Sequence, residues 1–519
     1  MLSAPTAKVT PQGVHQWLSE FGWDVDSRRS KYPTKYKFNK NTKEQFKLIV
    51  REYSRMEEEK DSRQFGSLLD SLARLSAGSR VEPRWAEVMK LVSNFLEVGE
   101  YGAMGTSAAL WDAVESPEQR NGYLAQVEDE VRHVTQCGYL AHYFASQYQD
   151  PAGFTDFRKF RFAHPFFGPD RNCVLDHALS GDPVQMSVNL QLVAEAAFTN
   201  PLIVQMCEVA AANGDEVTPT IFLSIESDEL RHMANGYQTI VSVVDDPDNM
   251  EYLQTDIDNA FWINHKFITP FVGAAFDYFA KNKTTPWAKT WDKWIYEDWG
   301  GIWLGRLSRF GVKSPAPLLD AKKDAYWAHH YAYASAWALW PLVGVRFELP
   351  TAGDLEWLEH NYPGFYDEIG NIFEHWAEDG YDDPANHALG VDLFINGKIP
   401  VYICRVCQMP TIMPTFYDGL TNVRILEYGG RKHALCSEWC ERMYLKEPER
   451  YTGQNYFELF DGWELSEIVQ ASGMVRSDGK TLASQPHLNS ERLWTIDDLK
   501  KCGVVIRDPL THGMFAEKV

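Results

Sequence analysis

The sequence predicts a mainly α-helical protein, a bundle of long helices elaborated with further helices and followed by a small C-terminal α+β domain. Three observations predict this fold class. Long stretches in the first two thirds place apolar residues three or four positions apart, which is the period of an amphipathic helix. A pattern of glutamate and histidine occurs twice within such stretches. Beyond residue 345, short segments separated by turn dipeptides such as Asn396-Gly397 indicate a different architecture.

The helical bundle is expected over residues 71–345, after a polar and charged N-terminal arm or docking segment over residues 1–70. Breakers such as Gly181-Asp182-Pro183 separate its helices. Helices are predicted over Trp85–Met104, Asn121–Phe144, Ser187–Asn213 and Pro219–Val244. Tryptophans at helical spacing in Trp287–Trp303 predict a packed core.

The C-terminal α+β domain is expected over residues 346–519. Val423–Tyr428 and Lys432–Leu435 have the composition of strands and flank Gly429-Gly430, so they predict a hairpin.

Composition and charge narrow the possible functions. The 519 residues carry a net charge of −22, and a chain this acidic argues against nucleic acid as a partner. The acidity fits either a well-solvated surface or a docking face for a basic partner protein. The longest apolar stretch, Ala332–Val345, is shorter than the roughly 20 residues of a membrane helix, and the N-terminus has no apolar signal region. We therefore expect a cytoplasmic protein without a membrane segment.

A five-residue pattern of possible metal ligands occurs twice in the sequence. Asp129–His133 reads DEVRH, and Asp228–His232 reads DELRH 99 residues later. Glutamate and histidine three positions apart project from one face of a helix, so both can reach one metal ion. A Glu-x-x-His on each of two helices, with one glutamate on each of two others, is the ligand set of a ferritin-like di-iron carboxylate bundle.

The additional glutamates precede the repeats in matching order. Glu195 lies 34 residues before Glu229, a gap that suits one helix, a turn and an antiparallel neighbour. Before Glu130, both Glu97 and Glu100 lie on one broad helix face, and the pattern alone leaves this choice open. A single Glu-x-x-His also occurs on solvated helices, so the second copy and the paired upstream glutamates are what favour a metal site.

Charge balance supports two irons. Four glutamates and two neutral histidines carry −4, and two ferrous ions carry +4, so the filled site is neutral and its burial is tolerable. Carboxylate oxygen and imidazole nitrogen suit iron or manganese. Asp129 and Asp228 each lie four residues before a ligand histidine, and an aspartate is the usual acceptor for the second imidazole N–H. Arg132 and Arg231 would offset their charge.

Five long segments are specific enough to indicate a family: FLEVGEY (Phe95–Tyr101), NGYLAQVEDEVRH (Asn121–His133), NLQLVAEAAFTNPLIV (Asn189–Val204), FLSIESDELRHMANGYQT (Phe222–Thr239) and WDKWIYEDWGGIW (Trp291–Trp303). With them, nearly the whole chain resembles the α subunit of the hydroxylase of bacterial multicomponent di-iron monooxygenases, and most closely soluble methane monooxygenase. The resemblance implies Glu100 rather than Glu97 as the first ligand. The expected iron ligands are then Glu100, Glu130, His133, Glu195, Glu229 and His232.

The resemblance also implies an activity. Reduced di-iron would react with O2 and insert one oxygen atom into an unactivated C–H or C=C bond. Electrons would come from NADH through a separate flavin and iron–sulfur reductase, because this chain shows no flavin or NAD motif. β and γ hydroxylase subunits and a small regulatory or coupling protein would complete the system.

Several further residues receive roles from the resemblance. Thr199, one helical turn after a ligand glutamate, would direct its hydroxyl at the irons for proton delivery; the alternative is a hydroxyl bonded back to its own helix. Asn200 and Glu226 match positions on the proton and gating path. Cys137 takes the place of the radical tyrosine in the ribonucleotide reductase small subunit, which argues against a stable tyrosyl radical.

The expected substrate cavity departs from that of the methane enzyme. Val174 and Ala178 stand where that enzyme has phenylalanines, so we expect a larger cavity and a substrate larger than methane, such as a short alkane or alkene. Leu96 matches the residue that gates the cavity. Ile203 and Ile225 are expected to line it.

Four of the eight cysteines lie near the C-terminus, as Cys404-x2-Cys407 and Cys436-x3-Cys440. This is the spacing of a four-thiolate zinc site, which would be structural because four protein ligands leave no open position. These cysteines are absent from the methane enzyme but resemble those of the phenol hydroxylase branch. The alternative is four buried free cysteines.

Two other functional classes are less favoured. A desaturase or radical-generating di-iron subunit conflicts with Cys137 and with the extent of the resemblance. A ferritin-like iron store would be a short single bundle, and a scaffold subunit would have lost ligands. The sequence therefore favours a monooxygenase, and it leaves open whether the natural substrate is methane, a larger alkane or alkene, or an aromatic compound.

Overall fold

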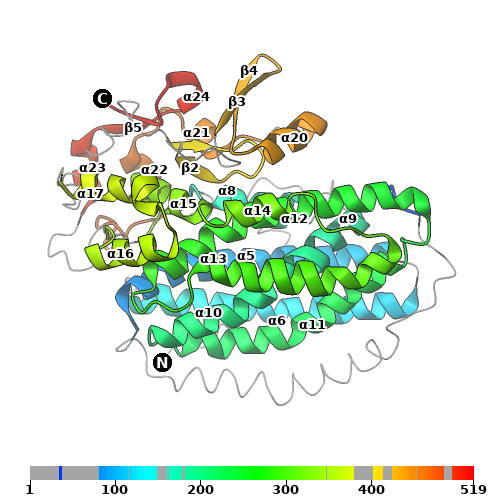
Figure 1. Ribbon diagram of the computed structural model, residues 1–519. Coiled ribbons are helices and arrows are strands. Elements are labelled where there is room, and N and C mark those ends of the chain that lie inside the picture. The colour runs from blue at the N-terminus through cyan, green and yellow to red at the C-terminus, as the bar shows by residue number, and fades with distance from the viewer. Residues whose placement is uncertain are drawn as a thin grey trace.

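The computed structural model describes residues 34–37, 81–114, 116–148, 161, 163–177, 182–345, 348–378, 401–412, 423–451, 453–483 and 494–519. Long helices form the body of the molecule, and a layer that contains the short strands lies on one side of it (Figure 1). The mainly helical fold class is confirmed. Almost all of the predicted N-terminal arm falls outside the described residues, and the domain boundaries stay predictions.

The bundle consists of α5 (Pro83–Ala113), α6 (Pro117–Tyr148), α9 (Pro183–Ser187), η3 (Val188–Thr199), α10 (Asn200–Ala212) and α11 (Val217–Val241). α5 and α6 pack along one another, and α11 packs on α6 and η3. The segments α9, η3 and α10 follow without a gap, so they form the fourth long element of the bundle. The four predicted helices are therefore confirmed.

The middle of that fourth element is π-helical. η3 spans twelve residues and includes Glu195. Pro201 follows it and has no N–H to donate, so the α-helical hydrogen-bond ladder cannot continue unbroken through this point. π-Helical turns occur frequently at functional sites, and this one carries a predicted ligand.

Further helices surround the bundle: α8 (Phe167–Asp170), η2 (Arg171–His177), η4 (Pro247–Asn249), α12 (Met250–Ala274), η5 (Ala275–Phe279), α13 (Trp287–Trp291), η6 (Asp292–Trp303), η7 (Leu304–Phe310), α14 (Leu318–Asp324), α15 (Ala328–Ala338), α16 (Ala352–Asn361), η8 (Tyr366–Gly370) and α17 (Asn371–Glu378). α12 packs on both η3 and α15. The predicted core role of this stripe is confirmed for Trp287, Trp291 and Trp299, which are fully buried, whereas Trp294 and Trp303 are half-buried.

The C-terminal layer contains β1 (Val401–Ile403), β2 (Pro410–Ile412), β3 (Arg424–Tyr428), β4 (Arg431–Leu435), α20 (Glu438–Lys446), η9 (Pro448–Tyr451), α21 (Tyr456–Leu459), α22 (Leu465–Ala471), α23 (Ile496–Cys502), β5 (Val504–Ile506), α24 (Pro509–His512) and β6 (Ala516–Lys518). The strands pair as antiparallel β1–β2, β3–β4 and β5–β6. The predicted hairpin is confirmed as β3–β4. Gly429 and Gly430 both have positive φ, as its two-residue turn requires.

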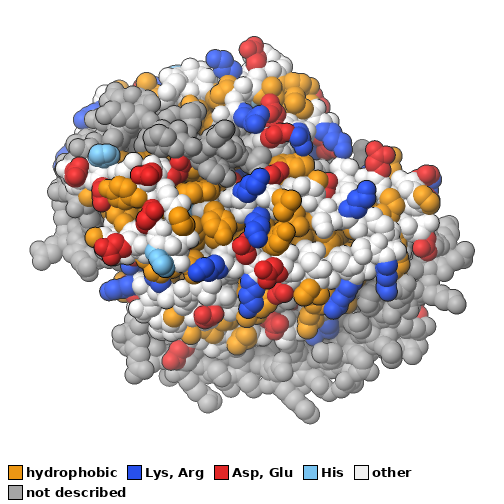
Figure 2. All heavy atoms as spheres, viewed as in Figure 1, with side chains coloured by type: hydrophobic (Ala, Val, Ile, Leu, Met, Phe, Trp, Pro, Cys, Tyr) orange, Lys and Arg blue, Asp and Glu red, His pale blue; other side chains and the backbone are white. Residues whose placement is uncertain are grey.

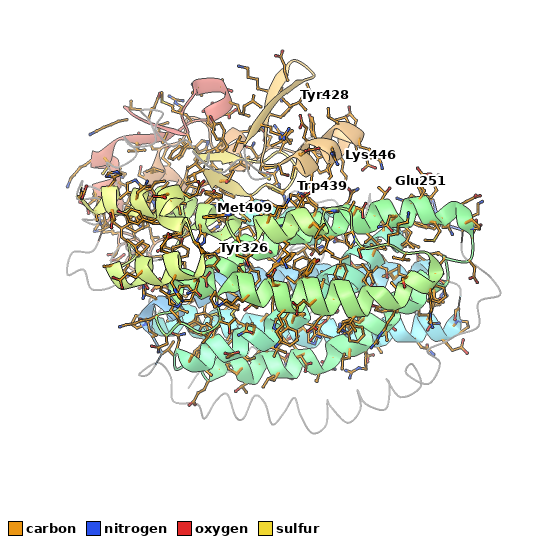
Figure 3. All side chains as sticks on the ribbon, viewed as in Figure 1. Glu251, Tyr326, Met409, Tyr428, Trp439 and Lys446 are labelled. Carbon is orange, nitrogen blue, oxygen red and sulfur yellow. The ribbon has the colours of Figure 1, made fainter. Side chains whose placement is uncertain are left out.

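The C-terminal layer meets the helical body near Trp439 and Met409, whereas Tyr428 lies toward the tip of the hairpin (Figure 3). Trp439 Nε1 donates a hydrogen bond to Asp320 Oδ2 of α14 at 3.0 Å. Acidic and basic side chains are interspersed over the face drawn in Figure 2, with groups of hydrophobic side chains between them. Within the described ranges, no helix has both the length and the apolar character needed to cross a bilayer.

Candidate metal centre and substrate cavity

The predicted iron ligands converge inside the bundle. α5, α6, η3 and α11 contribute Glu100, Glu130 and His133, Glu195, and Glu229 and His232, respectively. Two groups have ligand atoms that lie within 4.8 Å of one another, namely Glu100–Glu130–His133 and Glu130–Glu195–His232. Glu130 belongs to both groups, so it could contribute a ligand to each.

Both imidazoles present Nδ1 to the glutamates. His133 Nδ1 lies 3.2 Å from Glu130 Oε2 and 3.5 Å from Glu100 Oε2. His232 Nδ1 lies 3.3 Å from Glu130 Oε1 and 3.6 Å from Glu195 Oε1. The ring centroids are 5.7 Å apart. The carboxylates therefore gather at the one nitrogen of each ring that a metal would use.

The aspartates of the repeats pair across the two helices. His133 Nε2 lies 3.1 Å from Asp228 Oδ2, and His232 Nε2 lies 3.3 Å from Asp129 Oδ2. Each histidine thus contacts the aspartate of the other repeat, not the one four residues before it. An aspartate that accepts the Nε2–H favours the tautomer in which Nδ1 is free to bind a metal.

The arginines of the repeats link the same two aspartates. Arg132 forms an ion pair with Asp129, and its Nη2 lies 3.6 Å from Asp228 Oδ2. Arg231 forms an ion pair with Asp228, and its Nη2 lies 3.6 Å from Asp129 Oδ2. All four side chains are buried. The two positive charges offset the two buried carboxylates, as such burial requires.

The structure brings Glu100, rather than Glu97, to His133. Glu97 instead forms an ion pair with Arg161. Cys137 lies beside the cluster, with its Sγ 3.8 Å from Glu100 Oε1. Burial, reinforced by the charges of Glu100 and Glu97, raises the pKa of the Cys137 thiol well above its usual value. Cys137 is therefore a neutral thiol at the edge of the site.

The ligand carboxylates have unused binding capacity. Glu195 Oε2 and Glu229 Oε2 are buried and have no hydrogen-bond partner among the described residues, although Glu229 Oε2 lies 3.6 Å from His232 Nδ1. Burial, followed by the charge of Glu229, raises the pKa of Glu195 to about 8. Bound cations would stabilise these buried carboxylates, whose oxygens lack partners, so these residues fit a metal centre.

Sequence reasoning missed an amide network behind the ligands. Gln126 Nε2 donates to Glu130 Oε1 at 3.1 Å and to Glu195 Oε1 at 3.2 Å. Gln126 Oε1 accepts hydrogen bonds from Gln191 Nε2 at 3.4 Å and from Asn235 Nδ2 at 3.2 Å. Gln126 lies four residues before Glu130, so one-turn spacing was the available signal.

A largely apolar cavity of about 150 Å³ adjoins the ligands Glu100, Glu195 and Glu229. The predicted residues Leu96, Val174 and Ile203 line it. Ile225, one turn before the ligand Glu229, is buried in the core and does not line this cavity. Ala178 lies outside the described residues.

Of the three residues expected on the proton and gating path, one lines the cavity and two do not. Thr199 lines the cavity, and its hydroxyl donates to the Ala194 carbonyl at 3.2 Å. This is the backbone-bonded alternative, and it spans five residues because the segment is π-helical. Asn200 and Glu226 are half-buried and do not line this cavity.

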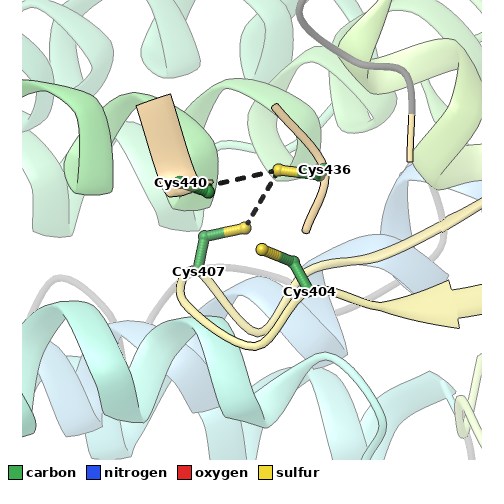
Figure 4. A group of neighbouring side chains, drawn as sticks. All are labelled: Cys404, Cys407, Cys436 and Cys440. Atoms are coloured by element: carbon green, nitrogen blue, oxygen red, sulfur yellow. Dashed lines mark hydrogen bonds between the residues drawn. The ribbon is translucent and has the colours of Figure 1, made fainter. Parts of the chain in front are cut away.

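The four C-terminal cysteines form a second cluster. Cys404 and Cys407 lie between β1 and β2, Cys436 follows β4, and Cys440 belongs to α20. All four are buried, none forms a disulfide, and their sulfurs lie within 4.8 Å of one another. Cys436 Sγ is 3.6 Å from the sulfurs of both Cys407 and Cys440 (Figure 4).

The cysteine cluster lies against α12. Trp262 Nε1 donates to Cys440 Sγ at 3.3 Å. Lys266, one turn further along α12, is buried, and its Nζ lies 2.8 Å from Asp324 Oδ2. Although burial opposes it, Asp324 and the nearby Cys436 raise the pKa of Lys266. A buried cation and an N–H donor therefore face the sulfurs, which suits an anionic thiolate site.

Comparison with known proteins assigns this arrangement to a family. Residues 23–247 match the family described as methane/phenol/alkene hydroxylase. The methane monooxygenase component A alpha chain of Methylococcus capsulatus is 54% identical over 507 residues, covering 98% of this chain and 96% of that one. The chain belongs to this hydroxylase family. The propane 2-monooxygenase hydroxylase large subunit of Gordonia sp. is 32% identical, over 94% of this chain and 92% of its own.

A solved structure agrees with the hydroxylase fold. Phenol hydroxylase from Pseudomonas sp. OX1, in a xenon-pressurised crystal, superposes with a TM-score of 0.69 at 22% identity, over 90% of this chain and 92% of that chain. The family is one of carboxylate-bridged di-iron hydroxylases, and the described glutamates and histidines could hold metal. This chain is therefore the hydroxylase subunit of a multicomponent monooxygenase, which acts with a β subunit and other components.

Proposed function

We propose that this subunit carries the active site of a monooxygenase that oxidises short-chain hydrocarbons, with two irons held by Glu100, Glu130, His133, Glu195, Glu229 and His232. The observation that carries the proposal is a carboxylate, Glu130, shared by two ligand groups whose other glutamates, Glu100 and Glu195, line an apolar cavity. The donors are oxygen and nitrogen, which suit iron. Two ferrous ions would neutralise the four ligand glutamates.

When bound, the two irons supply the activation of O2 and the oxidising power for oxygen insertion. The residues of the chain orient the metal ligands and keep water away from the site. Asp228 and Asp129 hold the Nε2–H of the ligand histidines, and Gln126 orients Glu130 and Glu195 through its amide N–H groups. The apolar wall excludes water and binds the hydrocarbon by burial of its surface.

We infer a substrate larger than methane, a short alkane or alkene. Val174 lines the cavity and packs directly over Gly102 of α5, where a Cβ would overlap Val174 Cγ1. The cavity of about 150 Å³ matches an engineered apolar cavity of about 150 Å³ that takes up benzene or xenon. Methane and propane, the substrates in the names of the two relatives, both fall within that size.

The experiment is a substrate panel with the assembled hydroxylase and its electron-transfer components. NADH-dependent O2 uptake and products are measured with methane, ethene, propane and butane. We expect the highest kcat/KM for the hydrocarbons larger than methane. Turnover of methane alone would contradict the proposed substrate class, whereas the absence of hydrocarbon-stimulated NADH oxidation would contradict the proposed function.

We propose β and γ hydroxylase subunits, a regulatory or coupling protein and an NADH-dependent flavin and iron–sulfur reductase as partners. The names of the relatives support an assembly, since they describe one chain of one component. The sequence shows no flavin or NAD motif, so an external electron source is required. Co-purification of the expressed components, followed by mass spectrometry of the intact complex, tests this composition.

We propose that Cys404, Cys407, Cys436 and Cys440 bind one structural zinc ion. Four buried sulfurs within 4.8 Å of one another support a closed tetrathiolate site. Trp262 and Lys266 support an anionic cluster, because they place an N–H donor and a cation beside it. Metal analysis is expected to give about one zinc per chain in addition to iron; a protein that folds with iron but without zinc would refute the assignment.

A further inference from the structure

The substrate cavity contains a carboxyl group that the proposed metal centre does not use. Asp170, the last residue of α8, is fully buried and lines the cavity. Neither of its carboxyl oxygens has a hydrogen-bond partner among the residues that the structure describes. Burial of a polar group without a partner is unfavourable, so Asp170 has a binding capacity that its surroundings leave unfilled.

The polar side chains that share this part of the cavity satisfy one another. Cys173 Sγ donates to Asn264 Oδ1 at 3.2 Å, and Asn264 Nδ2 donates to Asn189 Oδ1 at 3.0 Å. Asn189 Nδ2 in turn donates to the Cys173 carbonyl at 3.2 Å. All three residues line the same cavity as Asp170. Among these four side chains, Asp170 is therefore the one whose polar atoms are both available for a ligand.

The surroundings of Asp170 favour the neutral carboxylic acid form of its side chain. Burial raises its pKa well above the usual value, and the charge of Arg161 opposes this only in part. The guanidinium of Arg161 is engaged with Glu97. A neutral carboxyl group offers one O–H donor and one carbonyl acceptor side by side. A hydroxyl group can match both at once, because it also donates and accepts.

The cavity joins this carboxyl group to the proposed metal centre. Glu100, Glu195 and Glu229 line one part of it and Asp170 another, and the lining is otherwise mainly apolar. Asn189, in the polar group beside Asp170, precedes Glu195 by six residues on η3, a separation of at most about 9 Å along a helix axis. A molecule that fills this cavity can therefore contact both parts.

We propose that Asp170 is the binding site for the hydroxyl group of a small alcohol in the substrate cavity. The Asp170 O–H donates to the alcohol oxygen, and the Asp170 carbonyl oxygen accepts the alcohol O–H. A hydrocarbon makes neither bond, so the site distinguishes the hydroxylated product from the substrate. The identity of the alcohol as a product rests on the proposed function, whereas the binding site itself rests only on the cavity and its carboxyl group.

The test compares 2-fluoroethanol with fluoroethane, two probes that differ by one hydroxyl group. Their dissociation constants for the assembled hydroxylase are measured by fluorine NMR. Asp170→Leu removes both hydrogen-bonding functions and should weaken 2-fluoroethanol binding roughly three- to tenfold, with fluoroethane unaffected. Asp170→Asn keeps a donor and an acceptor in the same volume, so it serves as the matched control and should bind 2-fluoroethanol within about twofold of the unmodified protein.

Two outcomes would overturn the proposal. Unchanged 2-fluoroethanol affinity in Asp170→Leu would mean that the carboxyl group holds water only. An equal loss of affinity for both probes would mean that the variant alters the cavity rather than a hydroxyl site. Thermal unfolding shows whether the fold is intact. We expect the unfolding temperature of Asp170→Leu not to fall, because the substitution removes an unpaired buried polar group. Because no turnover is measured, a protein that binds 2-fluoroethanol through Asp170 but oxidises no hydrocarbon would contradict the proposed function and not this site.

Discussion

The ligand histidines depend on carboxylates that come from the opposite helix. His133 of α6 contacts Asp228 of α11, and His232 of α11 contacts Asp129 of α6. A carboxylate that accepts the outer N–H of a metal-binding imidazole raises the basicity of the ring and fixes its orientation. Each aspartate therefore supports the ligand group centred on the histidine of the other repeat.

Replacement of Asp228 by Asn is expected to weaken iron binding by about 10- to 100-fold, because the amide accepts the His133 N–H less well than a carboxylate does. The crossed pairing adds a specific expectation: the iron bound by His133 should be affected more than the iron bound by His232. Competitive chelation gives the affinity, and Mössbauer spectra separate the two irons. The exposed Asp112 of α5, replaced by Asn, is the control. Iron affinity equal to that of the control would contradict the supporting role of Asp228.

Val174 should set the upper size of the substrate. Val174→Phe fills part of the cavity, so kcat/KM for butane should fall relative to that for ethane by roughly tenfold or more. Val174→Ala enlarges the cavity and should shift the ratio in the opposite direction. Steady-state kinetics with the two alkanes provides the measurement. A butane-to-ethane ratio that stays constant across the series would show that Val174 does not limit the cavity.

How far single residues could be predicted depends on how local their signal is. His133 and His232 follow from a pattern within one helix turn, whereas the choice between Glu97 and Glu100 required the resemblance to a family. For Gln126, the local signal is its one-turn spacing from Glu130. Asp170 has none, because only the folded chain shows that its carboxyl group is buried in a cavity and lacks a partner.

Close approach of α11 and η3 positions two ligands from different elements. A Cβ at Gly236 of α11 would overlap the Cβ of Gln191 of η3. Glu229 lies on α11 and Glu195 on η3, so the spacing of these elements also sets the spacing of the two carboxylates. The glycine is therefore required by the contact rather than by its backbone conformation.

Gly236→Ala is expected to lower the free energy of unfolding by about 1–3 kcal/mol, because the added methyl group must push the two elements apart. It should also weaken iron binding. Gly305→Ala is the matched control, since a Cβ there meets nothing within 4 Å; that change should be neutral or should stabilise by up to about 1 kcal/mol. Chemical denaturation measures both. Similar effects of the two substitutions would contradict the close-packing argument.

Elements were predictable where the side-chain period decides them. The apolar period gave the long helices, and the turn glycines gave the β3–β4 hairpin. The π-helical state of η3 was not predictable, because π-helical and α-helical turns differ in backbone hydrogen bonds more than in the spacing of apolar residues. The approach of Gly236 to Gln191 is a tertiary contact, which no local period encodes.

α12 connects the cysteine cluster to the substrate cavity. Trp262 and Lys266 face the sulfurs, whereas Asn264, Phe267 and Phe271 of the same helix line the cavity. A helix held on one side by the C-terminal layer therefore forms a wall of the cavity on the other. The fold class of both parts was predictable from the sequence, but this connection was not, since it joins residues far apart in the chain.

Cys407→Ser is expected to remove the proposed zinc, loosen the C-terminal layer and increase amide hydrogen exchange in β1, α20 and α12. The six iron ligands are untouched, so the iron content should remain. Hydrogen–deuterium exchange mass spectrometry, together with metal analysis, provides the measurement. Cys207→Ser is the control, because Cys207 is half-buried on α10 and lies outside the cluster. Increased exchange confined to the C-terminal layer, with α12 unchanged, would show that the connection carries no stability.

The crossed aspartates mean that neither half of the bundle is self-sufficient. A fragment with only α5 and α6 would keep His133 but lose Asp228, and it would keep Asp129 with no imidazole to accept from. The same loss applies in mirror fashion to a fragment with η3 and α11. Complementation of two separately expressed halves should therefore restore both metal positions together or neither.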